Sequence, residues 1–204
     1  MTEERKGITL RQGDALIVVD VQSDFLPGGA LAVPEGDAVI APLNNAIANF
    51  AAKGLPIFFS RDWHPPDHCS FSCRGGPWPP HCVQGSPGAA FAPGLHVPPP
   101  ATVIAKGTDP QREEYSAIAG RNEEGHTLGE LLQQGGIRRV FVGGLATEYC
   151  VLNTVRDLAS LGVALFVLAD AVRAVELKLG DGAAALQGMA SLGAAMITTE
   201  MLAP

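Results

Sequence analysis

The chain has 204 residues, of which 47% are hydrophobic, and this composition suits one domain with a single sizeable core. Its formal net charge of −7 comes without a basic patch or an arginine-rich run, so nucleic acids and membranes are not expected partners. No apolar run approaches the roughly 20 residues that span a bilayer, and the start of the chain lacks the apolar stretch of a signal peptide. We therefore expect a cytoplasmic protein, a monomer or homo-oligomer, that acts on a small molecule.

In the first half of the chain, β-branched runs alternate with segments of helical period. We expect a strand at 15–20, a helix at 36–53 and a second strand at 55–60. The first strand reads "ALIVVD", and such an unbroken apolar run is typical of burial on both faces of a sheet. A Pro/Gly-rich segment at 61–100 is too rich in breakers for regular structure, so it is either a functional loop or disordered. A third strand is expected at 101–107.

The second half of the chain repeats this alternation of helices and strands. Its expected helices and strands, in chain order, are 126–136, 138–144, 148–161, 163–170, 181–192 and 194–199. We find no internal repeat and no linker that would divide the chain. The sequence therefore predicts one doubly wound α/β domain over residues 1–204, with a six-stranded, mainly parallel sheet and helices on both faces.

Four chemically useful side chains follow the predicted strands. Asp20 ends the first strand, Asp62 follows the second, Lys106 ends the third and Cys150 lies just beyond the fourth. In doubly wound sheets, ligands bind at the carboxyl ends of the strands. The four side chains should therefore meet at one edge, where they would supply a base, a charge partner and a nucleophile.

Cys150 stands near the start of a predicted helix, after a strand. Unpaired amide groups and the helix dipole at such a position favour a thiolate and lower the pKa of a thiol. The same amide groups could hold the oxyanion of a tetrahedral intermediate. The alternative is a buried core cysteine without chemistry.

The segment "RDWHPPDH" and the later "WPPHC" bring together good metal ligands. The candidate ligands are Asp62, His64, His68 and His81. One carboxylate with three imidazoles suits one divalent transition metal such as zinc, iron or manganese, with open positions for water or substrate. We therefore interpret the loop at about 61–100 as metal-binding.

Two other interpretations of this loop stay open from spacing alone. Cys69, Cys73 and Cys82 with one histidine would make a closed structural zinc site. Histidines near prolines are also common in plain surface turns. A structural zinc site would mean a binding module without catalysis, and would leave Asp20 and Cys150 unexplained.

Six stretches resemble one known family, in the same order along the chain. They are "VVDVQSDFLPGGALAV" (18–33), "SRDWHPPDHCSF" (60–71), "WPPHCVQGSPGA" (78–89), "AKGTD" (105–109), "EYSAIAG" (114–120) and "GLATEYCV" (144–151). They are similar to those of the bacterial nicotinamidases, also called pyrazinamidases, of the isochorismatase-like cysteine hydrolase superfamily. The resemblance implies hydrolysis of nicotinamide, and of pyrazinamide, to the acid and ammonia, as in NAD salvage.

The resemblance also implies roles for individual residues. The family's catalytic triad falls on Asp20, Lys106 and Cys150, and its four metal ligands fall on the candidates named above. In this family the ring nitrogen of the substrate binds the metal. The substrate-binding positions fall on Phe25, Trp78, Tyr115, Ala146 and Thr147. Phe25 and Trp78 would sandwich the ring, the Ala146–Thr147 bond would be the family's cis peptide, and the amides of Ala146 and Cys150 would form the oxyanion hole.

Some residues depart from the family pattern. The segment between His68 and His81 is shorter than in many relatives, and Ile118 stands where phenylalanine is more usual. These changes leave the lid and the substrate preference open. The nearest rival is a metal-independent amidohydrolase of the same superfamily that acts on carbamoyl or ureido substrates, which should lack the histidine ligands.

Overall fold

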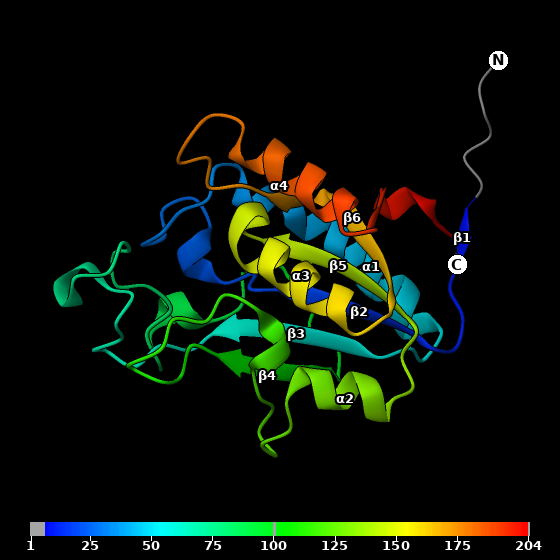
Figure 1. Ribbon diagram of the computed structural model, residues 1–204, viewed down its shortest axis with the longest axis horizontal. Coiled ribbons are helices and arrows are strands. Elements are labelled where there is room, and N and C mark those ends of the chain that lie inside the picture. Colours follow the sequence, from blue (N-terminus) through cyan, green and yellow to red (C-terminus); the bar gives the residue numbers. More distant parts are fainter. Residues whose placement is uncertain (1–6, 100, 204) are drawn as a thin grey trace.

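The computed structural model describes residues 7–99 and 101–203, and its centre is a six-stranded sheet (Figure 1). The strands are β2 (Asp14–Val19), β3 (Ile57–Asp62), β4 (Thr102–Lys106), β5 (Arg139–Leu145), β6 (Ala164–Arg173) and β7 (Ala195–Ile197). Their order in the sheet is β4-β3-β2-β5-β6-β7, and every neighbouring pair is parallel. The predicted α/β fold with a six-stranded sheet is confirmed.

Within the described residues, four α-helices cover the two faces of this sheet. They are α1 (Ile40–Ala52), α2 (Leu128–Gln134), α3 (Leu152–Ser160) and α4 (Asp181–Ser191). Helix α1 packs with alternate β2 residues, Leu16 and Val18, on one face. The other three helices pack with Ile17 and Val19 on the opposite face, in front of the sheet in Figure 1. All six residues of β2 are buried, so this strand is covered on both faces of the sheet, as its unbroken apolar run predicted.

Several element boundaries differ from the sequence prediction. The helix predicted at 36–53 begins with a 3₁₀ turn, Gly36–Val39, and the one predicted at 148–161 begins with a π-helical turn, Thr147–Val151. Helix α2 starts later than predicted because Thr127 is its N-cap and forms a capping box with Glu130 in the first turn. A separate pair of two-residue strands, β1 (Ile8–Thr9) and β8 (Leu202–Ala203), was not predicted, since two residues carry no periodic signal.

The chain order of the strands creates a crevice at one end of the sheet. The chain runs outward from β2 through β3 to β4, then returns to β5 beside β2 and runs outward the other way. Strand order therefore reverses between β2 and β5, where doubly wound sheets bind ligands at the carboxyl ends of the strands.

The long segment between β3 and β4 lies beyond the carboxyl ends of these strands (Figure 1). It contains two 3₁₀ turns, Ser72–Arg74 and Pro87–Ala89, and isolated bridges that include His64 with Val83 and Phe71 with Trp78. The segment is thus an ordered loop over most of its length, as expected for a functional one. Among the described residues, no helix has the length and apolar character needed to cross a membrane.

Phe50 of α1 tests the importance of the helix-to-sheet packing. It is fully buried and meets Phe141 of β5 edge-on, with ring centroids 5.4 Å apart. Phe50→Ala should lower the free energy of unfolding by about 3–5 kcal/mol, because neighbouring side chains would not fill the cavity that the deleted ring leaves. Urea denaturation measures this, with the exposed Leu177→Ala as control, which should change stability by less than about 0.5 kcal/mol. Equal stabilities of the two variants would show that the packing of Phe50 against Phe141 does not stabilise the fold.

Candidate active site

Cys150 lies in the turn that leaves the crevice side of β5. Its side chain is buried, at 5% exposure, and its turn is the π-helical segment that precedes α3. Gly143 and Gly144, near the end of β5, allow this strand to pass close to β2, because a Cβ on Gly144 would collide with the backbone of Val19 in β2. The close contact of β5 with β2 brings Cys150 beside the residue that follows β2, which is Asp20.

The cis peptide bond is placed one bond away from its predicted position. The structure has it between Leu145 and Ala146, not between Ala146 and Thr147. Strand β5 extends to Leu145, so the chain turns at the junction of this residue with Ala146. Ala146 lines the pocket beside Cys150, whereas Thr147 is buried and does not line it.

The buried ammonium group of Lys106 joins the predicted triad. Its Nζ lies 2.9 Å from Asp20 Oδ2 and 3.4 Å from Cys150 Sγ, and it donates a hydrogen bond to Asp62 Oδ1. Lys106 is 1% exposed. The structure therefore brings together all four side chains that the sequence placed at the strand ends.

Electrostatics in this cluster keep Lys106 charged and the thiol protonated. Burial alone would lower the pKa of Lys106, but the carboxylates of Asp20 and Asp62 raise it well above its ordinary value. Burial raises the pKa of the Cys150 thiol even though Lys106 opposes the rise. The expectation of a lowered thiol pKa was wrong, because the cysteine is buried more deeply than its place before a helix indicated. Burial also raises the pKa of Asp20, against the effect of Lys106.

The carboxylate of Asp20 is fixed through one of its two oxygens. Ser60 Oγ donates a hydrogen bond of 2.7 Å to its Oδ1. Its Oδ2 is buried and, within residues 7–99 and 101–203, accepts no hydrogen bond of good geometry. One ligand atom each from Asp20, Asp62 and Cys150 lies within 4.8 Å of the other two. Ser60 was missed by the sequence analysis, which gave no reason to pair a strand serine with Asp20.

Asp62, His64 and His81 form a compact group with free ligand atoms. One nitrogen or oxygen atom from each lies within 4.8 Å of the other two, and all three residues are buried. His64 Nδ1 lies 2.9 Å from the Gly107 carbonyl oxygen, and His81 Nδ1 lies 2.7 Å from that of Pro79. Because a carbonyl only accepts, each Nδ1 carries a proton, which leaves Nε2 as the ligand atom of each ring. Burial also lowers the pKa of His81, so its ring is neutral, as a metal ligand must be.

His68 lies next to this group, but its ring nitrogens are engaged elsewhere. Its ring centroid is 4.2 Å from that of His64. Its Nε2 lies 3.0 Å from the Arg112 carbonyl oxygen and its Nδ1 lies 2.7 Å from Ser70 Oγ. The structure thus brings three of the four predicted ligands together, with the fourth beside them.

Gln22 fixes the start of the ligand loop, and the sequence analysis missed it. This fully buried amide donates to the carbonyl oxygen of Asp62 at 2.8 Å, and its Oε1 accepts from the Asp62 amide at 2.7 Å. A second donated bond, at 3.0 Å, reaches the Ala89 carbonyl at the far end of the loop. Gln22 belongs to the motif that begins at Val18, but the sequence does not show that its side chain bonds the backbone of Asp62 and Ala89.

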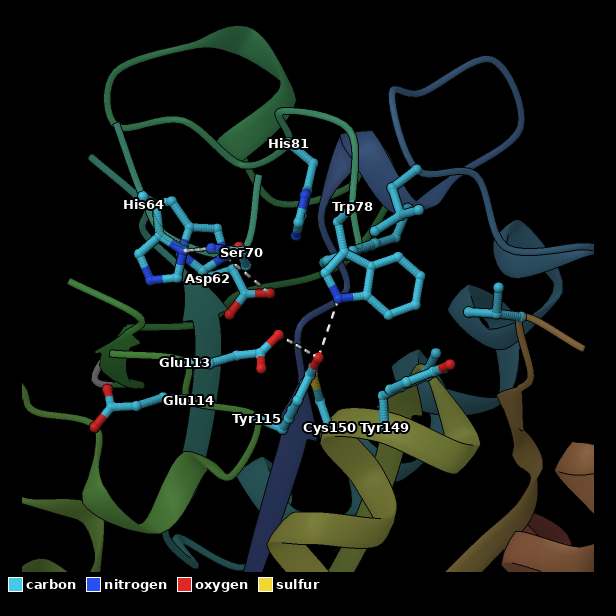
Figure 2. Close-up of a pocket in the computed structure, with 15 residues that line it drawn as sticks. Asp62, His64, Ser70, Trp78, His81, Glu113, Glu114, Tyr115, Tyr149 and Cys150 are labelled. Atoms are coloured by element: carbon cyan, nitrogen blue, oxygen red, sulfur yellow. Dashed lines mark hydrogen bonds and ion pairs between the residues drawn. The ribbon is translucent and has the colours of Figure 1, made fainter. Parts of the chain in front are cut away.

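Aromatic side chains enclose the pocket between the ligand group and Cys150 (Figure 2). The lining includes the three aromatic residues predicted to bind substrate, Phe25, Trp78 and Tyr115, together with Tyr149, which was not predicted. Trp78 meets Tyr149 edge-on, with centroids 5.0 Å apart. A flat ring bound between these side chains would place one end near the histidines and the other near the thiol.

Comparison with known proteins identifies similar chains. The family model described as the isochorismatase domain matches residues 14–201. The nicotinamidase of Escherichia coli (strain K12) is 38% identical over 200 residues, which cover 90% of this chain and 94% of that protein.

Two solved structures are similar over most of their length. The pyrazinamidase of Pyrococcus horikoshii in complex with zinc is 45% identical with a TM-score of 0.84, covering 91% of this chain and 99% of that one. PnC1 from L. infantum in complex with nicotinate is 37% identical with a TM-score of 0.87, covering 97% of this chain and 98% of that one.

Gln22 provides a test of how the ligand group is held. Gln22→Ala should weaken metal binding by about 10–100-fold, because groups that orient the ligands set the affinity of a site. Competition against a chromogenic chelator measures the affinity. Gln84→Ala is the matched control, since the Gln84 side chain also bonds a backbone carbonyl of this loop, that of Trp63, but is not buried. Identical affinities for both variants would show that Gln22 does not position Asp62.

Proposed function

Because this chain belongs to the isochorismatase domain family, we propose that its pocket hydrolyses nicotinamide to nicotinic acid and ammonia. The chain is an enzyme with nicotinamidase activity, and pyrazinamide, which has the same carboxamide on a flat ring, is a second substrate. The observation that carries this proposal is the single pocket lined by both Cys150 and the ligand group of Asp62, His64 and His81.

The ligand group fits one divalent transition metal ion, because a buried carboxylate and two buried imidazoles each offer one ligand atom within 4.8 Å of the other two. Asp62, His64 and His81 would hold it. His68 is the proposed fourth ligand, which requires its Nε2 to release the Arg112 carbonyl. Zinc, iron and manganese all suit these donors. When bound, the ion supplies a Lewis acid for the ring nitrogen of the substrate, which directs the carboxamide toward Cys150.

The first half of the reaction forms a thioester. Asp20 accepts the Cys150 proton on Oδ2, and the thiolate attacks the carboxamide carbon. The amides of Ala146 and Cys150 are the proposed donors to the resulting oxyanion. Asp20 then gives the proton to the departing nitrogen, the carbon–nitrogen bond breaks, and ammonia leaves the nicotinoyl group on sulfur.

The second half restores the enzyme with water. Asp20 accepts a proton from the attacking water, whose oxygen bonds to the thioester carbon. The carbon–sulfur bond breaks, the sulfur regains a proton from Asp20, and nicotinic acid is released. Throughout, the Lys106 ammonium group stays beside both Asp20 and Cys150, so it offsets the negative charge that passes between them.

The two rival functions have less support. Among the described residues, no group of close metal-binding atoms includes Cys69, Cys73 or Cys82, so a closed zinc module lacks its ligands. A carbamoyl or ureido substrate would use the same thiol but would leave the histidine group and the aromatic side chains without a ring to bind.

Replacing the nucleophile tests the chemistry. Cys150→Ala should reduce ammonia release from nicotinamide by at least about a thousandfold while leaving metal content unchanged, because no other group can form the thioester. Cys73→Ala is the matched control, since Cys73 is exposed in the ligand loop and should keep full turnover. Substantial turnover by Cys150→Ala would refute the covalent route.

Removing the metal tests the role of the ligand group. A chelated sample should lose nicotinamide turnover but keep its circular dichroism spectrum, because the hydrophobic clusters that join the sheet to its helices do not include the ligand group. Activity should return when zinc, iron or manganese is added singly. Unfolding on chelation would instead indicate a structural site, and undiminished turnover would exclude a metal from substrate binding.

A further inference from the structure

The Trp78 side chain, a wall of the pocket, is tied to a second segment of the chain. Its indole Nε1 donates a hydrogen bond of 3.0 Å to the Tyr115 hydroxyl group, as Figure 2 shows. Trp78 belongs to the loop between β3 and β4, whereas Tyr115 follows β4. This contact is thus a link between the ligand loop and the segment on the other side of the pocket.

The Tyr115 hydroxyl group continues the chain of hydrogen bonds to Glu113. It donates to Glu113 Oε1 at 2.5 Å. An indole N–H only donates and a carboxylate only accepts, so the hydroxyl must accept from Trp78 and donate to Glu113. All bonds in the chain therefore run one way, from Trp78 through Tyr115 to Glu113. Burial and the Glu113 carboxylate both raise the pKa of Tyr115, which keeps its proton in place.

The other contacts of Trp78 do not hold the Nε1 edge of its indole, so this edge depends on the hydrogen bonds through Tyr115 to Glu113. Its backbone amide donates to the Ser70 carbonyl at 3.0 Å, which holds the loop but not the ring. Tyr149 packs against the indole edge-on, and Tyr149 in turn lies 5.6 Å from the Tyr115 ring, measured between centroids. Rotation of Trp78 would break its bond to Tyr115 and disturb both tyrosines.

We propose that Glu113 is a positioning residue for the substrate ring: through Tyr115 it fixes the indole of Trp78 and holds the two pocket segments together. The proposal rests on the proposed function for its substrate. Glu113 itself is exposed at the pocket mouth and lines the pocket. Its effect is on the shape of the ring site, so it acts on substrate binding and leaves the chemical step at Cys150 unchanged.

Three variants separate the hydrogen bond from the charge. Glu113→Ala and Tyr115→Phe each remove the hydrogen bond between Tyr115 and Glu113. Each should raise KM for nicotinamide about three- to tenfold, with kcat within twofold of the parent. Glu113→Gln keeps an oxygen that accepts from Tyr115 but removes the charge, so its KM should stay within twofold of the parent. Glu123→Ala, another exposed glutamate outside the pocket, is the matched control and should change nothing.

A fluorescence measurement tests the same proposal without turnover. The chain has two tryptophans, Trp63 and Trp78, so a Trp63→Phe background makes Trp78 the sole emitter. Glu113→Ala and Tyr115→Phe should lower the fluorescence anisotropy of Trp78, because the ring gains motion, and Glu113→Gln should restore it. Denaturation curves of the same samples confirm that each variant is folded.

The outcomes are distinct. A Glu113→Gln variant as impaired as Glu113→Ala would show that charge, not the hydrogen bond, matters, and would overturn the proposal. Unchanged Trp78 anisotropy in Glu113→Ala would overturn it as well, as would a fall in kcat with unchanged KM. If the parent protein releases no ammonia from nicotinamide, the proposed function fails, while the anisotropy still decides whether Glu113 orients Trp78.

Discussion

The site depends on the contacts of the buried ammonium group of Lys106. Four neighbouring strands of the sheet each contribute one side chain to it: Lys106 ends β4, Asp62 ends β3, Asp20 follows β2 and Cys150 follows β5. Without its positive charge, two buried carboxylates would face each other and a thiol. Breaking such a buried ion pair costs about 3–5 kcal/mol. The sheet and the active site are therefore specified by the same contact.

Asp62 connects the two halves of the proposed chemistry. One of its oxygens accepts from Lys106, and the other lies 3.7 Å from His64 Nε2. Burial would raise the pKa of Asp62, but the Lys106 ammonium group lowers it far below its ordinary value, so it stays ionised. A carboxylate shared in this way fixes the ligand group relative to Cys150. The distance between ring binding and bond cleavage is thus set by the spacing of β3 and β5 across β2.

The sequence predicted the parts that depend on the strands. Buried strands leave an apolar signal, and their carboxyl ends must meet, so the positions of Asp20 and Cys150 followed. Features set by packing across loops could not be predicted this way. Neither the hydrogen bonds that occupy His68, nor the approach of Tyr149 to Trp78, nor the burial that raises the pKa of Cys150 has a periodic signature.

In the proposed mechanism, the reaction passes through a nicotinoyl group on Cys150. Hydroxylamine competes with water for such a thioester, so the ratio of hydroxamic to nicotinic acid reports on the species attacked. The most direct test compares this ratio for nicotinamide and methyl nicotinate, which share the acyl group but not the leaving group. A common thioester predicts the same ratio from both. Different ratios, or no hydroxamic acid from either substrate, would exclude a shared thioester on Cys150.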